Sequence, residues 1–159
     1  MLIAQLNNSK KGQKGFTLIE LLVVIGILAI LLAIVLIAIN PARQFGQANN
    51  TRRISDVTQI LNAIGAYEAD NAGQLPSTIP LNTASPAYID ANDATLCAAI
   101  VPNYIPSLPV DPTVNNGAAY TTCAAATTAT GYHVSKDANG HVTVTASITD
   151  NSATISNTR

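Results

Sequence analysis

The chain has 159 residues, enough for one domain with an appended segment, and only 11% of them are charged, against a usual share of about a quarter. Eight basic residues oppose nine acidic ones, so the net charge of −1 excludes a nucleic-acid-binding protein that works through a basic field. Two cysteines and two histidines are too few for a zinc module or for a small fold held by many disulfides.

Residues 16–39 form the first predicted element, an apolar helix in which Glu20 is the only charged side chain. At about 1.5 Å per residue the helix is about 36 Å long, which exceeds the bilayer hydrocarbon core of about 30 Å. A soluble helix seldom stays apolar on every side for so long, and the run ends in Asn40-Pro41 without the small-residue cleavage site of a secretory signal. We therefore expect a membrane span, with a buried soluble helix and a signal peptide as the alternatives.

The preceding residues 1–15 contain three lysines and no acidic residue. Basic flanks tend to stay in the cytoplasm, which predicts a cytoplasmic amino end. Arg43, Arg52 and Arg53 follow the span and nearly balance that count, so this orientation also depends on the cysteine pair described below.

Glu20 lies one helical turn inside the apolar run, where an ionised carboxylate costs about 3 kcal/mol. Close to the interface, the side chain can reach water or take up a proton. Alternatively, cleavage after Gly15 would create an α-amine on Phe16, one turn away on the same helix face. That amine would neutralise Glu20 of the same chain, or of a neighbour shifted by about one turn. In the second case the ion pair would set the register in which helices pack, because a misplaced pair does not repay its desolvation.

The sequence KGFTLIE at residues 14–20, which opens the span, resembles the start of type IV prepilins and pseudopilins, and the resemblance is dense over residues 12–34. It implies that residues 1–15 are a cytoplasmic leader, which a membrane peptidase removes by cutting between Gly15 and Phe16. It also implies N-methylation of Phe16 and a role for Glu20 in subunit register and assembly.

Pro41 interrupts the helix at the membrane edge and removes a backbone donor, which predicts a kink or a local loosening in one long helix that continues to about residue 72. Residues 40–74 are the expected amphipathic half of this helix, and Gly73 is the expected stop. Its predicted buried stripe has spacings of three, four and three and consists of Ile54, Val57, Leu61 and Ile64.

Residues 75–159 are expected to form a globular head. Seven of the eight prolines lie in residues 75–117, which predicts a connecting loop. An α+β fold is expected, in which the long N-terminal helix packs against a small antiparallel sheet. The predicted elements of the head are a short helix at 94–101, a turn at 115–117, strands at 118–122, 131–136 and 141–148 with a hairpin turn at Asn139-Gly140, and an edge strand at 153–157.

Cys97 and Cys123 are an even pair in a segment placed outside the membrane, which predicts a disulfide, with two free buried thiols as the alternative. No Ser/His/Asp order, Gly-rich phosphate loop or paired carboxylates in an apolar setting occur, so no enzymatic activity is predicted.

Candidate metal ligands are few. His133 and His141 flank the predicted hairpin without the further ligands that zinc requires. Asp111, Asn115 and Asn116 offer oxygens for calcium, as a loop near this position does in some major pseudopilins, but the EF-hand spacing is missing. We predict neither a metal site nor a cofactor.

The predicted function is that of a structural subunit of a type IV pilus-like filament, which polymerises through its N-terminal helix after leader cleavage. The resemblance implies a single-pass protein of the inner or plasma membrane that later enters a cell-surface or periplasmic filament. It also implies a prepilin peptidase, a membrane platform protein, an assembly ATPase and other subunits as partners. No direct nucleic-acid contact is predicted, because the chain without its leader has five basic and nine acidic residues.

Three alternatives stay open. A major pseudopilin of a type II secretion system is favoured by Leu108–Pro112, LPVDP, which resembles an LPxDP-like segment of that class. A membrane-anchored binding head that never polymerises and a secreted enzyme with an ordinary signal are the other two.

Overall fold

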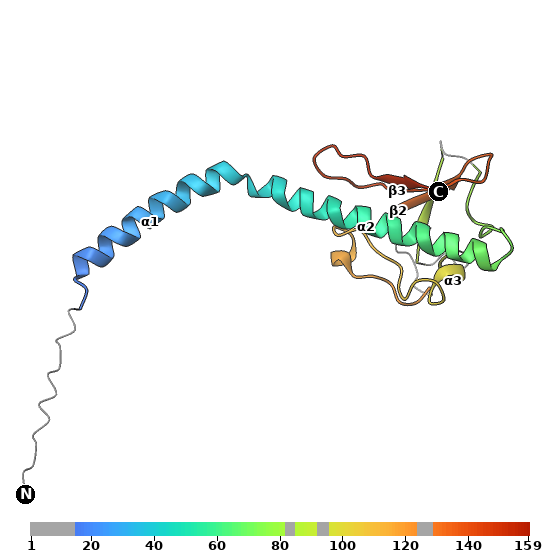
Figure 1. Cartoon of the computed structure of the whole chain (residues 1–159), viewed down its shortest axis with the longest axis horizontal. Coiled ribbons are helices and arrows are strands. Elements are labelled where there is room, and N and C mark those ends of the chain that lie inside the picture. Colours follow the sequence, from blue (N-terminus) through green and yellow to red (C-terminus); the bar gives the residue numbers. More distant parts are fainter. Residues whose placement is uncertain (1–14, 82–84, 92–95, 124–128) are drawn as a thin grey trace, which may run out of the picture. The chain divides into compact units, whose positions relative to one another are not determined.

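The computed structural model describes residues 15–81, 85–91, 96–123 and 129–159, so residues 1–14 of the predicted leader lie outside the described part (Figure 1). The chain divides into two compact units, Met1–Pro41 and Ala42–Arg159. The elements in chain order are α1 (Leu18–Ile39), α2 (Pro41–Asp70), β1 (Ala87–Asp90), α3 (Leu96–Ile100), the 3-10 turn η1 (Asn115–Gly117), β2 (Ala129–Lys136), β3 (Val142–Ala146) and β4 (Ser156–Thr158). The predicted α+β fold is confirmed.

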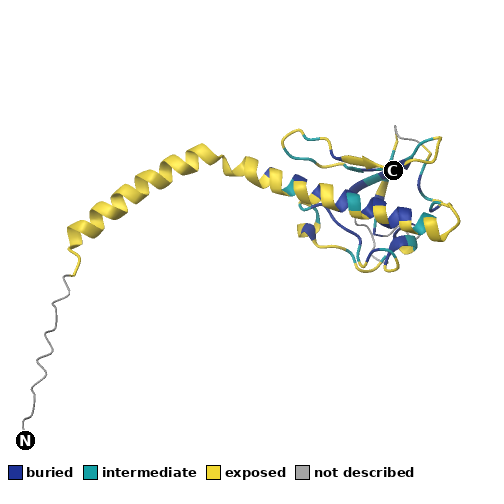
Figure 2. Ribbon diagram, in the orientation of Figure 1, coloured by how far each residue is buried: buried dark blue, intermediate teal, exposed yellow. Residues whose placement is uncertain are grey.

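Helix α1 is a 22-residue apolar rod, and every one of its residues is exposed (Figure 2). It is long and apolar enough to cross a membrane. Its apolar side chains point in all directions, so it has no polar face to turn toward water. A helix of this kind is stable only in an apolar environment that its own unit does not provide.

The predicted long helix is interrupted directly before Pro41. Asn40 has a positive φ of 45° and separates α1 from α2. The ring of Pro41 disfavours the right-handed helical conformation of the residue before it, and asparagine tolerates the left-handed one. Pro41 itself then occupies the first position of α2, where its missing N–H has no helical partner to lose.

The four strands form one antiparallel sheet in the order β1-β2-β3-β4. The β2–β3 hairpin places Val134 opposite Val144, and its turn is closed by Gly140, which has a φ of 90°. Strand β1 was missed within the expected connecting loop, because only one of its four residues, Ile89, is buried and four residues carry no readable period. The predicted strand at 118–122 is wrong, since only an isolated bridge between Leu108 and Tyr120 occurs there.

The core of the head lies between α2 and the sheet. Val57, Leu61 and Ile64 are buried as predicted, but Ile60 replaces Ile54 in the stripe, and Ile54 is 56% exposed. The cluster that these α2 residues join also contains residues from the sheet, α3 and the loops, among them Ile89, Leu96, Ile100, Leu108, Tyr132, Val134 and Val144.

A disulfide joins Cys97 on α3 to Cys123, with Cα atoms 5.7 Å apart and a sequence separation of 26. Closing a loop of this length restricts the unfolded chain, which stabilises the head by about 3–4 kcal/mol in the chain-entropy model.

A buried ion-pair cluster, formed by Arg53, Asp111 and Asp150, ties three segments of the head together. Arg53 on α2 is fully buried, and its Nε and Nη2 donate to Asp111 Oδ2 and Oδ1 at 2.6 and 3.0 Å. Its Nη1 donates to Asp150 Oδ2 at 2.7 Å and to Asn50 Oδ1 at 2.9 Å. Hydrogen bonding to Asp111 raises the pKa of Arg53, while burial of Asp111 is outweighed by hydrogen bonds from Arg53 and Thr113, which lower the pKa of that carboxyl. Both partners therefore stay charged inside the head.

Asp56 on α2 is also buried, beside the apolar stripe. Its Oδ2 accepts a hydrogen bond of 2.7 Å from the Tyr132 hydroxyl, and Arg52 Nε lies 3.9 Å from the same oxygen. Burial raises the pKa of Asp56, and burial together with this hydrogen bond raises the pKa of Tyr132. The face of α2 under the sheet is thus partly polar, which a stripe of apolar residues does not reveal.

Replacing Arg53 should destabilise the head far more than replacing its neighbour. Arg53→Met leaves the buried Asp111 carboxylate without its counter-ion, and we expect the free energy of unfolding to fall by about 3–5 kcal/mol. The control Arg52→Met removes a side chain that is 48% exposed and should cost about 1 kcal/mol. Urea unfolding of the full chain in detergent, followed by circular dichroism, measures both, and equal losses would contradict the assignment.

Candidate functional site

The start of α1 is the candidate site, and its geometry is a reciprocal cap between Thr17 and Glu20. Thr17 is the N-cap residue with extended backbone, and its Oγ1 accepts a hydrogen bond of 3.3 Å from the Glu20 amide. Glu20 Oε2 in turn accepts from the Thr17 amide at 2.8 Å and from the Thr17 hydroxyl at 2.7 Å. The carboxylate therefore has partners within its own chain.

This capping box was missed in the sequence, although its signal is present. Thr17-Leu18-Ile19-Glu20 has the S/T-x-x-E spacing that marks a helix N-terminus before an apolar run. The first backbone N–H groups of a helix have no partner in the preceding turn, and lipid offers them none. The cap thus explains why a threonine and a glutamate are tolerated at the end of an otherwise apolar rod.

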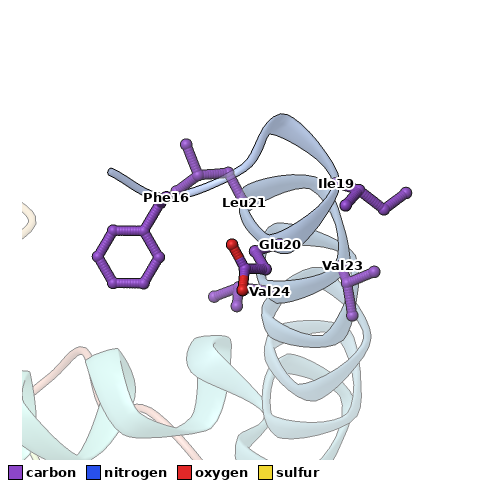
Figure 3. A pocket seen from close by; sticks show the side chains of 6 residues that line it. All are labelled: Phe16, Ile19, Glu20, Leu21, Val23 and Val24. Carbon is purple, nitrogen blue, oxygen red and sulfur yellow. The ribbon is translucent and has the colours of Figure 1, made fainter. Parts of the chain in front are cut away.

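Apolar side chains surround the carboxylate. Phe16, Ile19, Leu21, Val23 and Val24 line an open hollow together with Glu20, and Figure 3 shows Phe16 and Glu20 on the same side of the segment. The Phe16 side chain is 84% exposed, so no described part of the chain covers it. A cation brought beside this carboxylate among apolar side chains would be attracted more strongly than in water, because the local dielectric is low.

The predicted cleavage position lies in non-helical backbone. Gly15, Phe16 and Thr17 precede the first turn of α1 and are exposed. A Cβ added at Gly15 would meet nothing within 4 Å among the described residues, so the fold itself does not require glycine there.

The remaining candidate residues lie in the head. The carboxylate of Asp111, considered above as a calcium ligand, is occupied by Arg53 and by the amide and hydroxyl of Thr113. Asn115 and Asn116 form the 3-10 turn with positive φ angles of 47° and 53°. Within the described ranges, no group of three or more His, Cys, Asp or Glu side chains is placed to hold a metal ion.

The two histidines take separate roles. The Nδ1 of His141 lies 2.8 Å from Asp137 Oδ2 at the hairpin turn, and this hydrogen bond lowers the pKa of Asp137. His133 packs edge-on against Tyr88 with ring centroids 4.1 Å apart, and burial lowers its pKa.

Comparison with known proteins identifies the class. Residues 10–36 match the model of the prokaryotic N-terminal methylation motif. The chain is 32% identical over 110 residues to the type II secretion system core protein G of Aeromonas hydrophila. The aligned region covers 65% of this chain and 69% of that protein. No solved structure matches the chain. The chain therefore belongs to the type IV pilin and pseudopilin family, as its N-terminal segment predicted, and its apolar N-terminal helix fits a membrane-anchored pilin.

Removing the Thr17 hydroxyl should fray the first turn of α1. Thr17→Val keeps the side-chain shape but loses the cap, at a cost of about 1 kcal/mol. Amide hydrogen exchange at Glu20 and Leu21, whose N–H groups donate to Thr17, should accelerate by about fivefold when measured by NMR in detergent micelles. Thr17→Ser keeps the hydroxyl and should exchange like the unmodified chain. Unchanged exchange in Thr17→Val would show that the cap does not hold the helix end.

Proposed function

We propose that the chain is the precursor of a filament subunit that is cleaved between Gly15 and Phe16, methylated on Phe16 and polymerised through α1. The observation that carries this proposal is a wholly exposed apolar helix whose first turn presents one capped carboxylate, Glu20. Before assembly, α1 would anchor the subunit in the inner or plasma membrane, with the leader in the cytoplasm and the head on the other side. The disulfide in the head supports this orientation, because such bonds persist in oxidising compartments.

Assembly would move α1 from lipid into the filament core. Both surroundings are apolar, so the hydrophobic contribution changes little and close packing decides the association. In the membrane Glu20 is satisfied by Thr17 of its own chain. In the filament the α-amine on Phe16 of a neighbour would supply a charge in addition to these hydrogen bonds. Only the register that brings the two charges together repays their desolvation, so the pair would select one axial shift between subunits.

The prepilin peptidase, a membrane platform protein and an assembly ATPase are the proposed partners. The subunit itself needs no catalytic residue for this role, and we propose none.

A type II secretion pseudopilus is the second candidate for the filament. It is favoured by the relative, which is named as a core protein of that system, and by the LPVDP segment. This segment has a structural reason in the head, because Leu108 and Val110 are fully buried and Asp111 binds Arg53. A buried anchor of this kind would suit either filament.

Processing should depend on Gly15. Coexpressed with its peptidase, the chain should yield a mature protein that begins at N-methylated Phe16, as measured by mass spectrometry. Gly15→Leu should accumulate as the uncleaved precursor, because the described structure leaves room at this position and the restriction would lie in the enzyme. Gly26→Ala, at a glycine that is equally uncrowded within the chain, is the processed control. A mature protein that begins beyond residue 40 would indicate a secreted protein instead.

Filament formation should depend on the charge of Glu20, which can be removed while the cap is kept. Glu20→Gln preserves the capping box, since glutamine also serves at this position, but it removes the negative charge. We expect normal membrane insertion and processing with at least a tenfold loss of filaments, counted by electron microscopy. If neither the unmodified chain nor Glu20→Gln forms filaments, and both are inserted into the membrane alike, the chain would instead be a membrane-anchored binding head that does not polymerise. The length of the unmodified filaments separates a long surface pilus from a short pseudopilus.

A further inference from the structure

The head contains two Asn-Gly sequences in turns, Asn116-Gly117 in η1 and Asn139-Gly140 between β2 and β3. In such a sequence the backbone nitrogen of the glycine can attack the side-chain amide carbon of the asparagine, because glycine has no Cβ to hinder the approach. The attack forms a five-membered succinimide ring, which water then opens to aspartate or isoaspartate. Ring closure requires the backbone beside the asparagine to rotate, so its rate depends on how readily the fold lets the turn open.

The fold holds Asn116-Gly117 from both sides of Gly117. This glycine is buried, and its N–H, whose nitrogen would attack, donates to the Val114 carbonyl at 2.8 Å. Its carbonyl accepts a hydrogen bond from Arg52 Nη2 on α2. A Cβ at Gly117 would come within 2.7 Å of Arg52 Nη1, so the guanidinium lies directly against this residue. Rotation of the turn would separate it from α2, and Arg52 thereby protects Asn116.

Asn139-Gly140 has no such clamp. Ala138, Asn139 and Gly140 are all exposed, and a Cβ at Gly140 would meet nothing within 4 Å among the described residues. The Gly140 N–H donates to the Asp137 carbonyl at 3.2 Å, a longer bond than that of Gly117. Within the described ranges, the hydrogen bond found at Asn139 comes from its backbone N–H and not from its side chain. The side-chain amide can therefore turn toward the Gly140 nitrogen.

Opening the hairpin turn breaks few contacts. The Asp137 carboxylate holds the turn by accepting from the N–H groups of Asn139 and His141 at 2.9 and 2.8 Å, and both contacts are exposed to solvent. The buried Val134–Val144 pair of the hairpin lies outside the turn. Asn139 can therefore react while the sheet and the core stay folded.

We propose that Asn139 is a site of spontaneous deamidation in the folded protein and that Asn116 is protected from the same reaction. The Gly140 nitrogen forms a bond to Asn139 Cγ, and the bond from Cγ to Nδ2 breaks. The proton of the Gly140 N–H passes through solvent to Nδ2, which leaves as ammonia. One water molecule then adds to either carbonyl of the ring and opens it. The site lies wholly in the head, so it does not depend on the proposed filament.

Either product changes the surface of the hairpin turn. Both carry a carboxylate where the amide was, so the head gains a negative charge near Asp137. Isoaspartate also lengthens the main chain by one carbon directly before Gly140, which closes the turn with a φ of 90°. The two N–H groups that bind Asp137 then lie farther apart along the chain, which weakens the turn.

Mass spectrometry can follow the reaction in the full chain, incubated in detergent at mildly alkaline pH in water enriched in heavy oxygen. Trypsin cuts after Lys136, so one peptide begins at Asp137 and carries Asn139, and fragmentation assigns the modified residue. We expect Asn139 to be converted about tenfold faster than Asn116, with one heavy oxygen incorporated. In urea the two sites should react at rates within about twofold of each other, because only the fold distinguishes them.

Two variants test the cause of the difference. Asn139→Gln should abolish conversion at this position, because the longer side chain would have to close a less favourable six-membered ring. Arg52→Met removes the clamp on Gly117 and should raise the conversion of Asn116 by about threefold, with Asn139 unchanged.

Three results would overturn the inference. Equal rates at Asn116 and Asn139 in the folded chain would show that the contacts of the two turns do not control the reaction. If both sites react in urea while Asn139 stays unmodified in the folded chain, the hairpin turn protects it. Conversion at Asn139 without heavy oxygen would exclude the ring, because a carboxylate formed during the incubation must take an oxygen from water.

Discussion

The structure depends on one constraint, which is that the apolar surface of α1 is unfavourable in water on every side. Every residue of this helix is exposed, and the head buries its own core without it. Lipid and a bundle of identical helices are the two surroundings that meet this constraint, and each satisfies it about equally well. A subunit that exchanges one for the other crosses no large hydrophobic barrier, so weak polar terms at Thr17 and Glu20 can decide where and how it packs.

The loops of the head need links besides the apolar core, because a small domain with few aromatic residues has little core to hold them. Arg53 connects α2 to Asp111 in the LPVDP segment and to Asp150 in the β3–β4 loop, and the disulfide connects α3 to Cys123. Buried ion pairs add little net stability over a well-packed apolar alternative, but they penalise any arrangement that separates the charges. Together these links define one arrangement of loops that carry little regular structure.

Much of this arrangement is readable from the sequence, and the exceptions have physical reasons. Local sequence patterns reveal the apolar span and the hairpin at Asn139-Gly140. The cysteine pairing is readable because the chain has two cysteines, which allow one pairing. The Arg53–Asp111 pair joins residues 58 positions apart, and neither residue type signals burial by itself, so the sequence does not reveal this pair. Strand β1 was lost because four residues show no period. The capping box, in contrast, has a local signal, because Thr17 and Glu20 stand at the S/T-x-x-E spacing.

The break at Asn40 has a mechanical consequence for any fibre built from such subunits. A continuous helix resists stretching through its ladder of backbone hydrogen bonds, and Pro41 contributes no donor to that ladder. Tension carried along the backbone would meet its least resistance at this residue. Each residue that unwinds beside it increases its rise along the chain from about 1.5 Å to about 3.3 Å, so a few residues at this point would give the fibre extra length under tension.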